Sequence, residues 1–554
     1  MSDKLFLGRP IFADAALDAL ARQQGPEAAW RAALVRGPQE AARAAGGEFA
    51  VGFSDEAGRS FLAVDRFAVR SLCYRVDGGR LRFAERADQL ADAGSPLDPQ
   101  ALFDYLYFHV IPSPATVFQG VQRLPPGHCA WWDGATLSIT PYWVPQFEEQ
   151  EPADFDRLRD EFRTLLKDGV ARQLDGGKAA CFLSGGTDSS TVAGMIGLAA
   201  GRPAATYSIG FEAEGYDEMA FARIAAKRFG TEHHEYYVTP DDLVRSIGDV
   251  AASYDQPFGN SSAVPAYYCA RMAREDGVTR ILAGDGGDEL FGGNSRYAKQ
   301  RVFGWYHQLP AALRGGLMEP LLAQPTLARL PLLSKGASYV EQARVPMPDR
   351  MQMYNLLRRL GMAEVLTGDF LARVSVDEPL RSQRAVWAQA RAGSEVNRML
   401  AFDWRYTLAE TDLPKVCGTA RLAGIEVGFP MLDPALLAFS LRLPPDYKLK
   451  GLKLRWFFKE ALRGFLPDEI IGKKKQGFGL PFGVWATRHP GLHALAADSL
   501  GSLAGRGLVR PEFIRALLDT HLAAHPGYYG EMVWILMMLE QWLRRHAADY
   551  RLDA

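Results

Sequence analysis

The sequence predicts an α/β protein in two parts: a smaller β-rich part, then a larger part with a parallel sheet and helical additions. Up to residue 145 short apolar strands alternate with turns, whereas from residue 157 apolar strands alternate with helices. Short strands joined by turns form antiparallel sheets, and strands that alternate with helices form parallel sheets covered by those helices. With 554 residues, the chain is long enough for two or more domains.

The first part is predicted from apolar runs bounded by turn residues. Residues 47–53 and 60–64 are such runs, and 80–84 follows an Asp-Gly-Gly turn, as the second strand of a hairpin does. Helical spacing over 97–109 comes next. Three further strands are then expected, at 121–126, 128–132 and 137–143.

A linker is predicted between the two parts. Residues 145–156 are acidic, contain prolines and show no hydrophobic period. We therefore expect a domain at 1–144 and a second domain at 157–554.

The second part is predicted from strands that alternate with helices. We expect strands at 179–183, 204–211, 234–238 and 279–282, and helices at 190–200, 218–229, 240–254 and 263–275. This order is typical of a parallel sheet with crossover helices. Residues 295–400 read as helical and are rich in Arg and Leu, so we expect them to form a helical bundle added to the sheet.

Composition narrows the class of protein. Lys plus Arg is 63 and Asp plus Glu is 65, a net charge of −2, which gives no support for broad binding of nucleic acid or of an anionic membrane. The five cysteines are widely spaced without a CxxC pair, which favours free thiols in a reducing compartment. No secretory signal or membrane-spanning run is visible, so we expect a soluble, cytoplasmic protein.

The clearest motif is SGGTDSS at residues 184–190, between a predicted strand and a predicted helix. Two glycines allow a tight turn, and a helix that begins here directs N–H groups and its positive dipole end at the same point. The serine hydroxyls add donors, whereas Asp188 suits a phosphate site only if a divalent cation lies between them. The Walker A lysine is missing. An ordinary polar turn is the alternative interpretation.

A second motif, GDGGDELFGG at residues 284–293, follows the strand expected at 279–282. Ligands of open α/β sheets bind at the carboxyl ends of strands, so both motifs are expected at one edge. Asp188 and Asp288 could then converge on one Mg²⁺ that bridges phosphate oxygens. An acidic surface turn is the alternative, but such turns rarely need so many glycines.

These motifs resemble the synthetase domain of class B asparagine synthetases, which belong to the PP-loop ATP-pyrophosphatases. Further segments occur in that family's order: LPKV at 413–416, GIEV at 424–427, FPMLD at 429–433, LPP at 443–445 and KKQGFG at 474–479. The resemblance covers about 45–145 and 156–490.

The resemblance implies a role for each matching residue, with ATP and Mg²⁺ as cofactors. It implies Mg²⁺ binding by Asp188 and Asp288, and catalytic roles for Lys475, Asp285 and Glu426. Lys475 would neutralise charge in the transition state, and Asp285 and Glu426 would take a proton from the attacking amine. The positions implied for pyrophosphate are Ser184, Gly185, Gly186, Asp188, Ser189 and Ser190, and those implied for adenine are Phe182, Ile209 and Gly284.

The N-terminal part departs from the glutamine-dependent members of that family. They begin with a catalytic cysteine after the initiator Met, whereas this chain begins Met1-Ser2. The family's glutamine-binding stretches have no counterpart at workable spacing. We therefore expect a degenerate, truncated glutaminase-like (Ntn-type) domain that does not release ammonia. Gly8, Arg9 and Pro10 are expected to interrupt the strand that should follow Ser2.

A second departure concerns the acceptor pocket. The family usually has an Asp-Arg pair where this chain has Cys417 and Gly418, and an arginine where it has Gly428. Fewer cations near a carboxylate substrate argue against free aspartate held in the usual way.

The sequence therefore predicts an AMP-forming amide ligase that activates aspartate or a related carboxylate as an acyl-adenylate. Small-molecule or peptide carboxylates and amines are the expected substrates. The nitrogen could come from ammonia, an amine or a separate donor protein, and a homodimer is left open. Two alternatives remain: an intramolecular cyclase like β-lactam synthetase or lasso-peptide cyclase, and a nucleotide-binding pseudoenzyme that serves as a scaffold.

Overall fold

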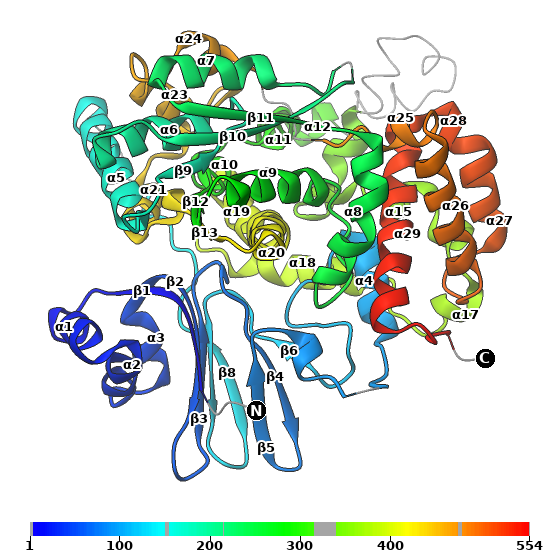
Figure 1. The fold of residues 1–554 in the computed structure, drawn as a ribbon, viewed down its shortest axis with the longest axis horizontal. Coiled ribbons are helices and arrows are strands. Elements are labelled where there is room, and N and C mark those ends of the chain that lie inside the picture. Colours follow the sequence, from blue (N-terminus) through cyan, green and yellow to red (C-terminus); the bar gives the residue numbers. More distant parts are fainter. Residues whose placement is uncertain are drawn as a thin grey trace.

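The structure is a computed structural model that describes residues 4–92, 94–149, 154–213, 215–314, 339–474 and 479–552. Figure 1 shows two parts: an N-terminal part of antiparallel strands, drawn in blue and cyan, and a larger part built around a parallel sheet. The predicted fold class is confirmed. None of the helices in these ranges combines the length and apolar character needed to cross a membrane.

The N-terminal part contains two antiparallel sheets. The larger has the order β1-β2-β3-β7-β8 and the smaller the order β5-β4-β6. The strands predicted at 60–64, 80–84 and 128–132 have these bounds in the structure. The elements are β1 (Lys4–Phe12), β2 (Ala45–Ser54), β3 (Ser60–Val64), β4 (Cys73–Asp77), β5 (Arg80–Ala84), α4 (Pro99–Phe108), β6 (Gln122–Arg123), β7 (His128–Trp132) and β8 (Leu137–Pro141).

The prediction that Gly8, Arg9 and Pro10 interrupt the first strand is wrong. β1 runs through all three residues and pairs with β2 along its whole length, with Pro10 opposite Gly47. Because β1 is an edge strand, the missing N–H of proline costs no ladder bond on the open side. Gly8 adopts a positive φ of 83°, which a glycine accepts without strain.

Three helices that the sequence analysis did not predict follow β1. They are α1 (Ala15–Gln24), α2 (Pro26–Leu34) and α3 (Pro38–Arg43), visible at the left of the N-terminal part in Figure 1. Trp30 of α2 is fully buried and packs its ring against Phe12, Phe49 and Phe61. These helices therefore cover one face of the large antiparallel sheet.

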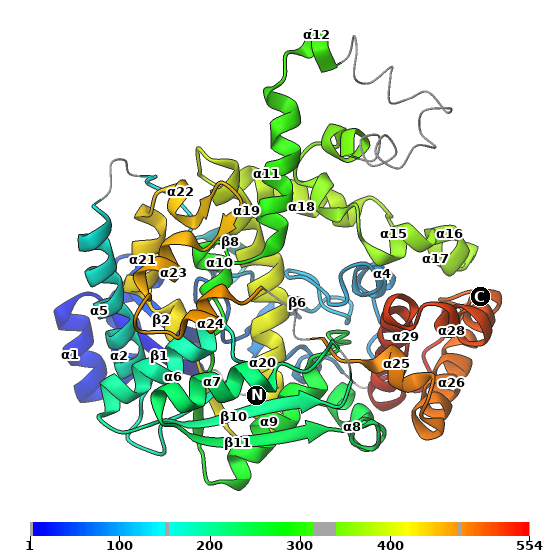
Figure 2. The same cartoon turned by 90° about the horizontal axis from the view of Figure 1, so that it is seen from above.

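The larger part has a parallel sheet of order β11-β10-β9-β12-β13. α6 and α7 cover one face and α9 lies on the other (Figures 1 and 2). The strands are β9 (Ala180–Phe182), β10 (Ala205–Phe211), β11 (Glu232–Val238), β12 (Arg280–Leu282) and β13 (Glu426–Gly428), and the helices are α5 (Phe155–Gln173), α6 (Thr187–Ala200), α7 (Met219–Phe229), α8 (Pro240–Ser253) and α9 (Ala263–Glu275). The predicted elements are confirmed, although α6 begins three residues early and includes Asp188.

Helices complete the larger part. The helical addition predicted at 295–400 is confirmed in the described residues by α11, α18 and α19, and α20 packs against α9. The C-terminal α29 is buried and packs against α8, α25 and α26. Their bounds are α11 (Ser295–Gln308), α18 (Glu378–Gln389), α19 (Glu395–Asp403), α20 (Leu413–Ala423), α25 (Phe482–Ala486), α26 (Pro490–Ala504) and α29 (Pro526–His546).

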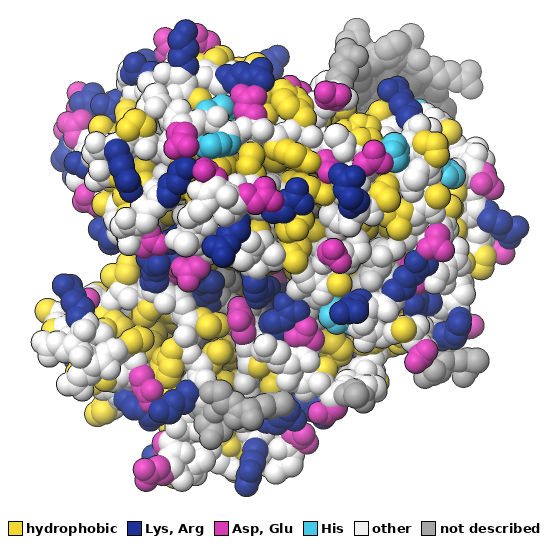
Figure 3. Space-filling model, in the orientation of Figure 1, with side chains coloured by type: hydrophobic (Ala, Val, Ile, Leu, Met, Phe, Trp, Pro, Cys, Tyr) yellow, Lys and Arg dark blue, Asp and Glu magenta, His cyan; other side chains and the backbone are white. Residues whose placement is uncertain are grey.

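Charged side chains join the two parts. Figure 3 shows basic and acidic side chains together along their boundary. Arg280 of β12 donates to Glu48 of β2 at 3.0 Å, and both side chains are almost fully buried. Arg123 donates to Glu410 at 2.7 Å across the same boundary. Because buried charges need paired partners, these contacts fix the orientation of the N-terminal part.

A buried carboxylate shapes the turn of the N-terminal part that faces the larger part. Asp65, after β3, accepts hydrogen bonds from the backbone N–H groups of Phe49, Phe67, Val69 and Arg70 at 2.9–3.3 Å. Burial raises the pKa of Asp65 to about 6, while these N–H donors oppose the rise. The carboxylate is therefore ionised at pH 7 and holds the turn in one conformation.

We predict that Asp65→Ala destabilises the protein by about 3 kcal/mol, because four buried N–H groups lose their acceptor. Thermal unfolding followed by circular dichroism measures the effect as a lower midpoint. Asp133→Ala is the matched control, since Asp133 is exposed and accepts two backbone bonds in the turn before β8. Equal midpoints for the two variants would contradict the role given to Asp65.

Candidate active site

The first glycine-rich turn lies between β9 and α6, at the carboxyl end of β9. Gly185 has a positive φ of 69°, and a Cβ atom there would overlap the backbone of Phe221 and Ala222 in α7. Gly186 caps α6, whose first N–H groups have no partner within the helix. The turn therefore presents N–H donors and the positive end of the helix dipole at one point.

Three serine hydroxyls lie at this turn. The Ser184 and Ser189 oxygens are 3.1 Å apart, and the backbone N–H of Ser184 donates to Ser189 Oγ at 3.2 Å. The Ser190 hydroxyl is buried and has no hydrogen-bond partner among the described residues. Since a buried hydroxyl without a partner is costly, Ser190 indicates that a polar ligand atom completes the turn.

The second glycine-rich loop follows β12 and packs directly on the first. A Cβ atom at Gly284 would lie 2.8 Å from the backbone nitrogen of Ser189, so only glycine permits this approach. β9 and β12 are neighbours in the sheet. The structure thus brings both motifs to the carboxyl edge of the sheet, as their positions in the sequence predict.

Arg455 lies between the two predicted metal ligands. Its Nη1 donates to Asp188 Oδ2 at 2.7 Å, to Asp288 Oδ1 at 2.8 Å and to Thr187 Oγ1 at 2.8 Å. The guanidinium is 4.3 Å from the centre of the Phe458 ring. Arg455 has a positive φ of 53°, which costs a residue with a side chain about 1–2 kcal/mol. No sequence motif points to Arg455, because it lies far along the chain from both motifs and belongs to no glycine-rich pattern.

The residues at this point fit a magnesium ion. The two carboxylates converge on one nitrogen atom, and carboxylate oxygens are the ligands that Mg²⁺ prefers. Gly287 and Gly293 leave room for them, because a Cβ atom would overlap the Asp188 oxygen at the first position and the Asp288 oxygen at the second. In this structure the Arg455 guanidinium offsets part of the two negative charges.

Asp285 and Glu289 of the second loop have raised pKa values. Burial raises the pKa of Asp285 to about 6, although the Lys415 ammonium opposes the rise, and burial raises the pKa of Glu289 to about 8. Lys415 also pairs with Asp412 at 2.9 Å. A carboxylate with a pKa near 6 is ionised at pH 7 and able to accept a proton, so Asp285 can act as a base.

Glu426 lies at the amino end of its strand, whereas the two glycine-rich loops lie at the carboxyl edge of the sheet. It is the first residue of β13, where its carboxylate accepts from Arg280 at 2.8 Å and from Arg9 at 3.4 Å. Its side chain is 58% exposed. The Glu426 carboxylate therefore accepts hydrogen bonds from arginines at the boundary of the two parts.

The three positions predicted for adenine lie on adjacent strands. Phe182 ends β9 and pairs with Tyr207 of β10, and Ile209 is two residues further along β10. Gly284 follows β12 and contacts the start of α6. Phe182, Ile209 and Gly284 are all partly exposed, so their backbone groups lie near the edge that carries the two loops.

Lys475 lies outside the described residues. Two residues earlier, Lys473 pairs with Glu218 at 2.9 Å and lies 4.5 Å from the centre of the Phe221 ring. Phe221 is also the residue that packs against Gly185. Lys473 therefore lies beside the residue of α7 that packs against the first glycine-rich turn.

Larger side chains fill the space beside Gly418 and Gly428, the two glycines at which this chain departs from the family near the acceptor pocket. A Cβ atom at Gly418 would overlap the ring of Tyr254. A Cβ atom at Gly428 would lie 2.6 Å from Gln173 Oε1 and 2.8 Å from Arg280 Nη2. Tyr254 and Arg280 thus occupy positions that larger residues at 418 and 428 would need.

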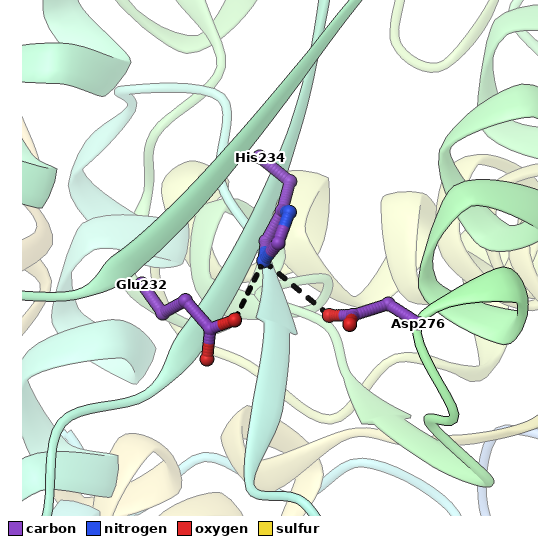
Figure 4. A group of neighbouring side chains, drawn as sticks. All are labelled: Glu232, His234 and Asp276. Atoms are coloured by element: carbon purple, nitrogen blue, oxygen red, sulfur yellow. Dashed lines mark hydrogen bonds and ion pairs between the residues drawn. The ribbon is translucent and has the colours of Figure 1, made fainter.

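A separate group of residues of the types that can ligate a metal ion lies at and near the start of β11. His234 Nε2 is 3.2 Å from Glu232 and 3.3 Å from Asp276 (Figure 4). The Lys178 ammonium pairs with the same carboxylates, at 3.2 Å from Glu232 and 2.5 Å from Asp276. Because Lys178 already balances the charge, this group is an ion-pair network of the surface.

Comparison with known families agrees with this geometry. Residues 161–544 match the model for asparagine synthase, which is more than half of the chain. The chain belongs to the asparagine synthase family. It is a carbon–nitrogen ligase of the asparagine synthetase type, and residues 27–143 match the model for a glutamine amidotransferase domain.

Several curated relatives of this family member cover most of its length. A Mycobacterium bovis protein named "Putative asparagine synthetase", glutamine-hydrolyzing, is 28% identical over 90% of this chain and 76% of its own. Glutamine-hydrolyzing asparagine synthetase 1 of Bacillus subtilis is 22% identical over 87% and 74%. Amidase chry2 of Gibberella zeae is 24% identical over 79% and 70%.

We predict that Gly287→Ala weakens binding of ATP with Mg²⁺ about tenfold, a loss of about 1.4 kcal/mol. The added methyl group would overlap the Asp188 carboxylate and crowd Arg455. Isothermal titration calorimetry measures the change. Gly197→Ala, in α6 with no atom within 4 Å of the new Cβ, is the control and should bind ATP like the parent protein. Unchanged binding by Gly287→Ala would argue against this metal site.

Proposed function

We propose that this ligase uses ATP with Mg²⁺ to activate a carboxylate as an acyl-adenylate and then forms an amide with ammonia or an amine. The convergence of Asp188 and Asp288 beside the N-terminus of α6 is the observation that carries this proposal. An anion site joined to a pair of carboxylates suits a nucleotide triphosphate with its cation. The names of the relatives support the same class of reaction.

In the first step, an oxygen of the substrate carboxylate attacks the α-phosphorus of ATP, and the bond to pyrophosphate breaks. Residues 184–190 hold the departing pyrophosphate through N–H groups and hydroxyls. Asp188 and Asp288 would hold Mg²⁺, which supplies positive charge to phosphate oxygens when bound. The carbonyl positions at Phe182, Ile209 and Gly284 receive adenine, and the Lys475 cation stabilises the charge that develops in the transition state.

In the second step, the amine nitrogen attacks the acyl carbon, and the bond to AMP breaks. The amine must lose a proton as it forms the amide. Asp285 is the first candidate to accept it, since its pKa of about 6 keeps it ionised at neutral pH. Glu426 is the second candidate, from the boundary of the two parts.

We predict that the protein catalyses exchange of labelled pyrophosphate into ATP in the presence of its carboxylate substrate. A panel of amino-acid and small-molecule carboxylates identifies that substrate. Asp288→Asn should abolish exchange because it removes half of the metal-binding charge. Asp276→Asn, in the surface network of Figure 4, should leave exchange unchanged. Release of ADP and orthophosphate as the only products would refute the proposal.

We also propose that the chain does not hydrolyse glutamine by itself. A cysteine nucleophile must reach the thiolate form. Burial raises the pKa of each of the five cysteines: Cys73, Cys129, Cys181, Cys269 and Cys417. The N-terminal part would then serve as a structural and substrate-binding unit.

We expect purified protein to release no glutamate from glutamine, measured by a coupled dehydrogenase assay. Ser2→Ala is the informative variant, because removal of Met1 would give Ser2 a free α-amino group that could activate its hydroxyl. Glutamate release that Ser2→Ala removes would overturn this proposal. Absence of release, with amide formation restored by ammonia or an added amine, would support it.

A further inference from the structure

A cavity of about 460 Å³ lies between the N-terminal part and the larger part. Its wall combines the turn after β3 with α20 and the start of β13. Ligand pockets typically measure about 300–1,000 Å³, whereas one water molecule occupies about 30 Å³. The cavity is therefore large enough for an organic molecule and much larger than ammonia requires.

Most arginines of the wall already have close partners. Arg86 donates to the carbonyl of Ser253 at 2.8 Å and to Asp88 at 2.6 Å. Arg123 donates to Glu410 at 2.7 Å, and Arg421 donates to Glu85 at 3.1 Å. These side chains hold the cavity open and join its two sides.

Arg70 is different from the other arginines of the wall. Among the described residues its guanidinium has one ion pair, with Glu48 at 3.7 Å, and its buried Nε has no hydrogen-bond partner. Glu48 already accepts from Arg280 at 3.0 Å. A guanidinium has five N–H donors in a planar fork that matches a carboxylate. Arg70 thus offers unused donors to a carboxylate in the cavity.

The backbone of Arg70 is fixed before any ligand arrives. Its N–H donates to Asp65, whose four backbone bonds define the turn. Cys417 of α20 contacts the same turn, where its thiol donates to the carbonyl of Val69 at 3.6 Å. The cation is therefore held at the wall without the need to order a mobile loop.

The cavity approaches the candidate active site along α20. Pro414 and Cys417 line the cavity, and Lys415, next to Pro414, is the residue whose ammonium opposes the rise in the pKa of Asp285. The wall also carries negative groups, among them Glu426, which is 58% exposed, and Glu85. A wall with unused guanidinium donors at one place and partly or fully exposed carboxylates at another suits a molecule that carries both charges.

We infer that this cavity binds the nitrogen-donating substrate, and that this substrate is an amine that also carries a carboxylate. The carboxylate binds Arg70 of the N-terminal part, and the ammonium faces the wall that contains Glu426. The amide-forming reaction in this inference rests on the proposed function, whereas the binding site itself does not. Arg70 acts here as a specificity-determining residue that the N-terminal part contributes to the ligase.

Binding of defined probes tests the site without any acyl substrate. The probes are the standard amino acids, β-alanine and γ-aminobutyrate, each compared with its carboxamide by saturation-transfer NMR on the full chain. At least one amino acid should bind, its carboxamide should bind at least tenfold more weakly, and Arg70→Met should weaken the amino acid to the same degree. Arg66→Met is the matched control, because Arg66 lies in the same turn and stacks on Trp143 outside the cavity wall.

A second measurement separates this inference from the proposed function. With the carboxylate that supports pyrophosphate exchange, Arg70→Met should form hydroxamate from hydroxylamine at the parent rate, while its amide formation with the bound amino acid falls at least tenfold. Arg70→Lys should recover part of that loss. Absence of pyrophosphate exchange would refute the proposed function alone. Failure of every amino acid to bind, or equal binding by Arg70→Met and the parent protein of the same thermal midpoint, would overturn the inference.

Discussion

The buried guanidinium of Arg280 is the interaction on which the arrangement of the molecule depends. Arg280 is the first residue of β12. Its guanidinium donates hydrogen bonds to Glu48 of β2, to Glu426 of β13, and to the backbone and side-chain oxygens of Gln173 at the end of α5. One side chain thereby joins the antiparallel sheet, the parallel sheet and the first helix of the larger part. Removing either partner of such a pair leaves a buried charge unpaired, which costs about 3–5 kcal/mol.

This anchor determines which residues meet at the boundary. Because Arg280 at the start of β12 holds Glu48 of β2, the turn after β3 lies against α20, where the Cys417 thiol donates to the carbonyl of Val69. Arg70 and Cys417 line the same cavity. The glycines at 418 and 428 belong to the same arrangement, since Tyr254 and Arg280 fill the space beside them. The unusual residues on the acceptor side are thus explained by the packing of the boundary.

The glycine-rich turns could be predicted from the sequence because their residues are local. Strand, turn and helix follow one another within twenty residues, and the glycines at 185 and 284 report directly on close backbone approach. Arg455 could not be predicted, because a left-handed backbone and two aspartates from distant segments place it.

The errors in the N-terminal part have a similar origin. The sequence pattern of residues 15–43 does not predict their helices, although Trp30 and several alanines bury one face of them against the sheet. Pro10 predicts a break because sequence alone does not show that β1 lies at an edge. In the larger part, the motif around Glu426 does not reveal the partners of its carboxylate, because Arg9 and Arg280 are far from it in the sequence.

The place of Arg455 between Asp188 and Asp288 has a consequence for the resting enzyme. Two carboxylates at such short range repel each other, and a cation between them offsets part of that repulsion. Arg455 supplies one positive charge against the two negative charges of Asp188 and Asp288. Because the guanidinium contacts both carboxylates, any cation that bound the two together would have to take its place. Occupation of this point and the position of the Arg455 side chain are therefore coupled.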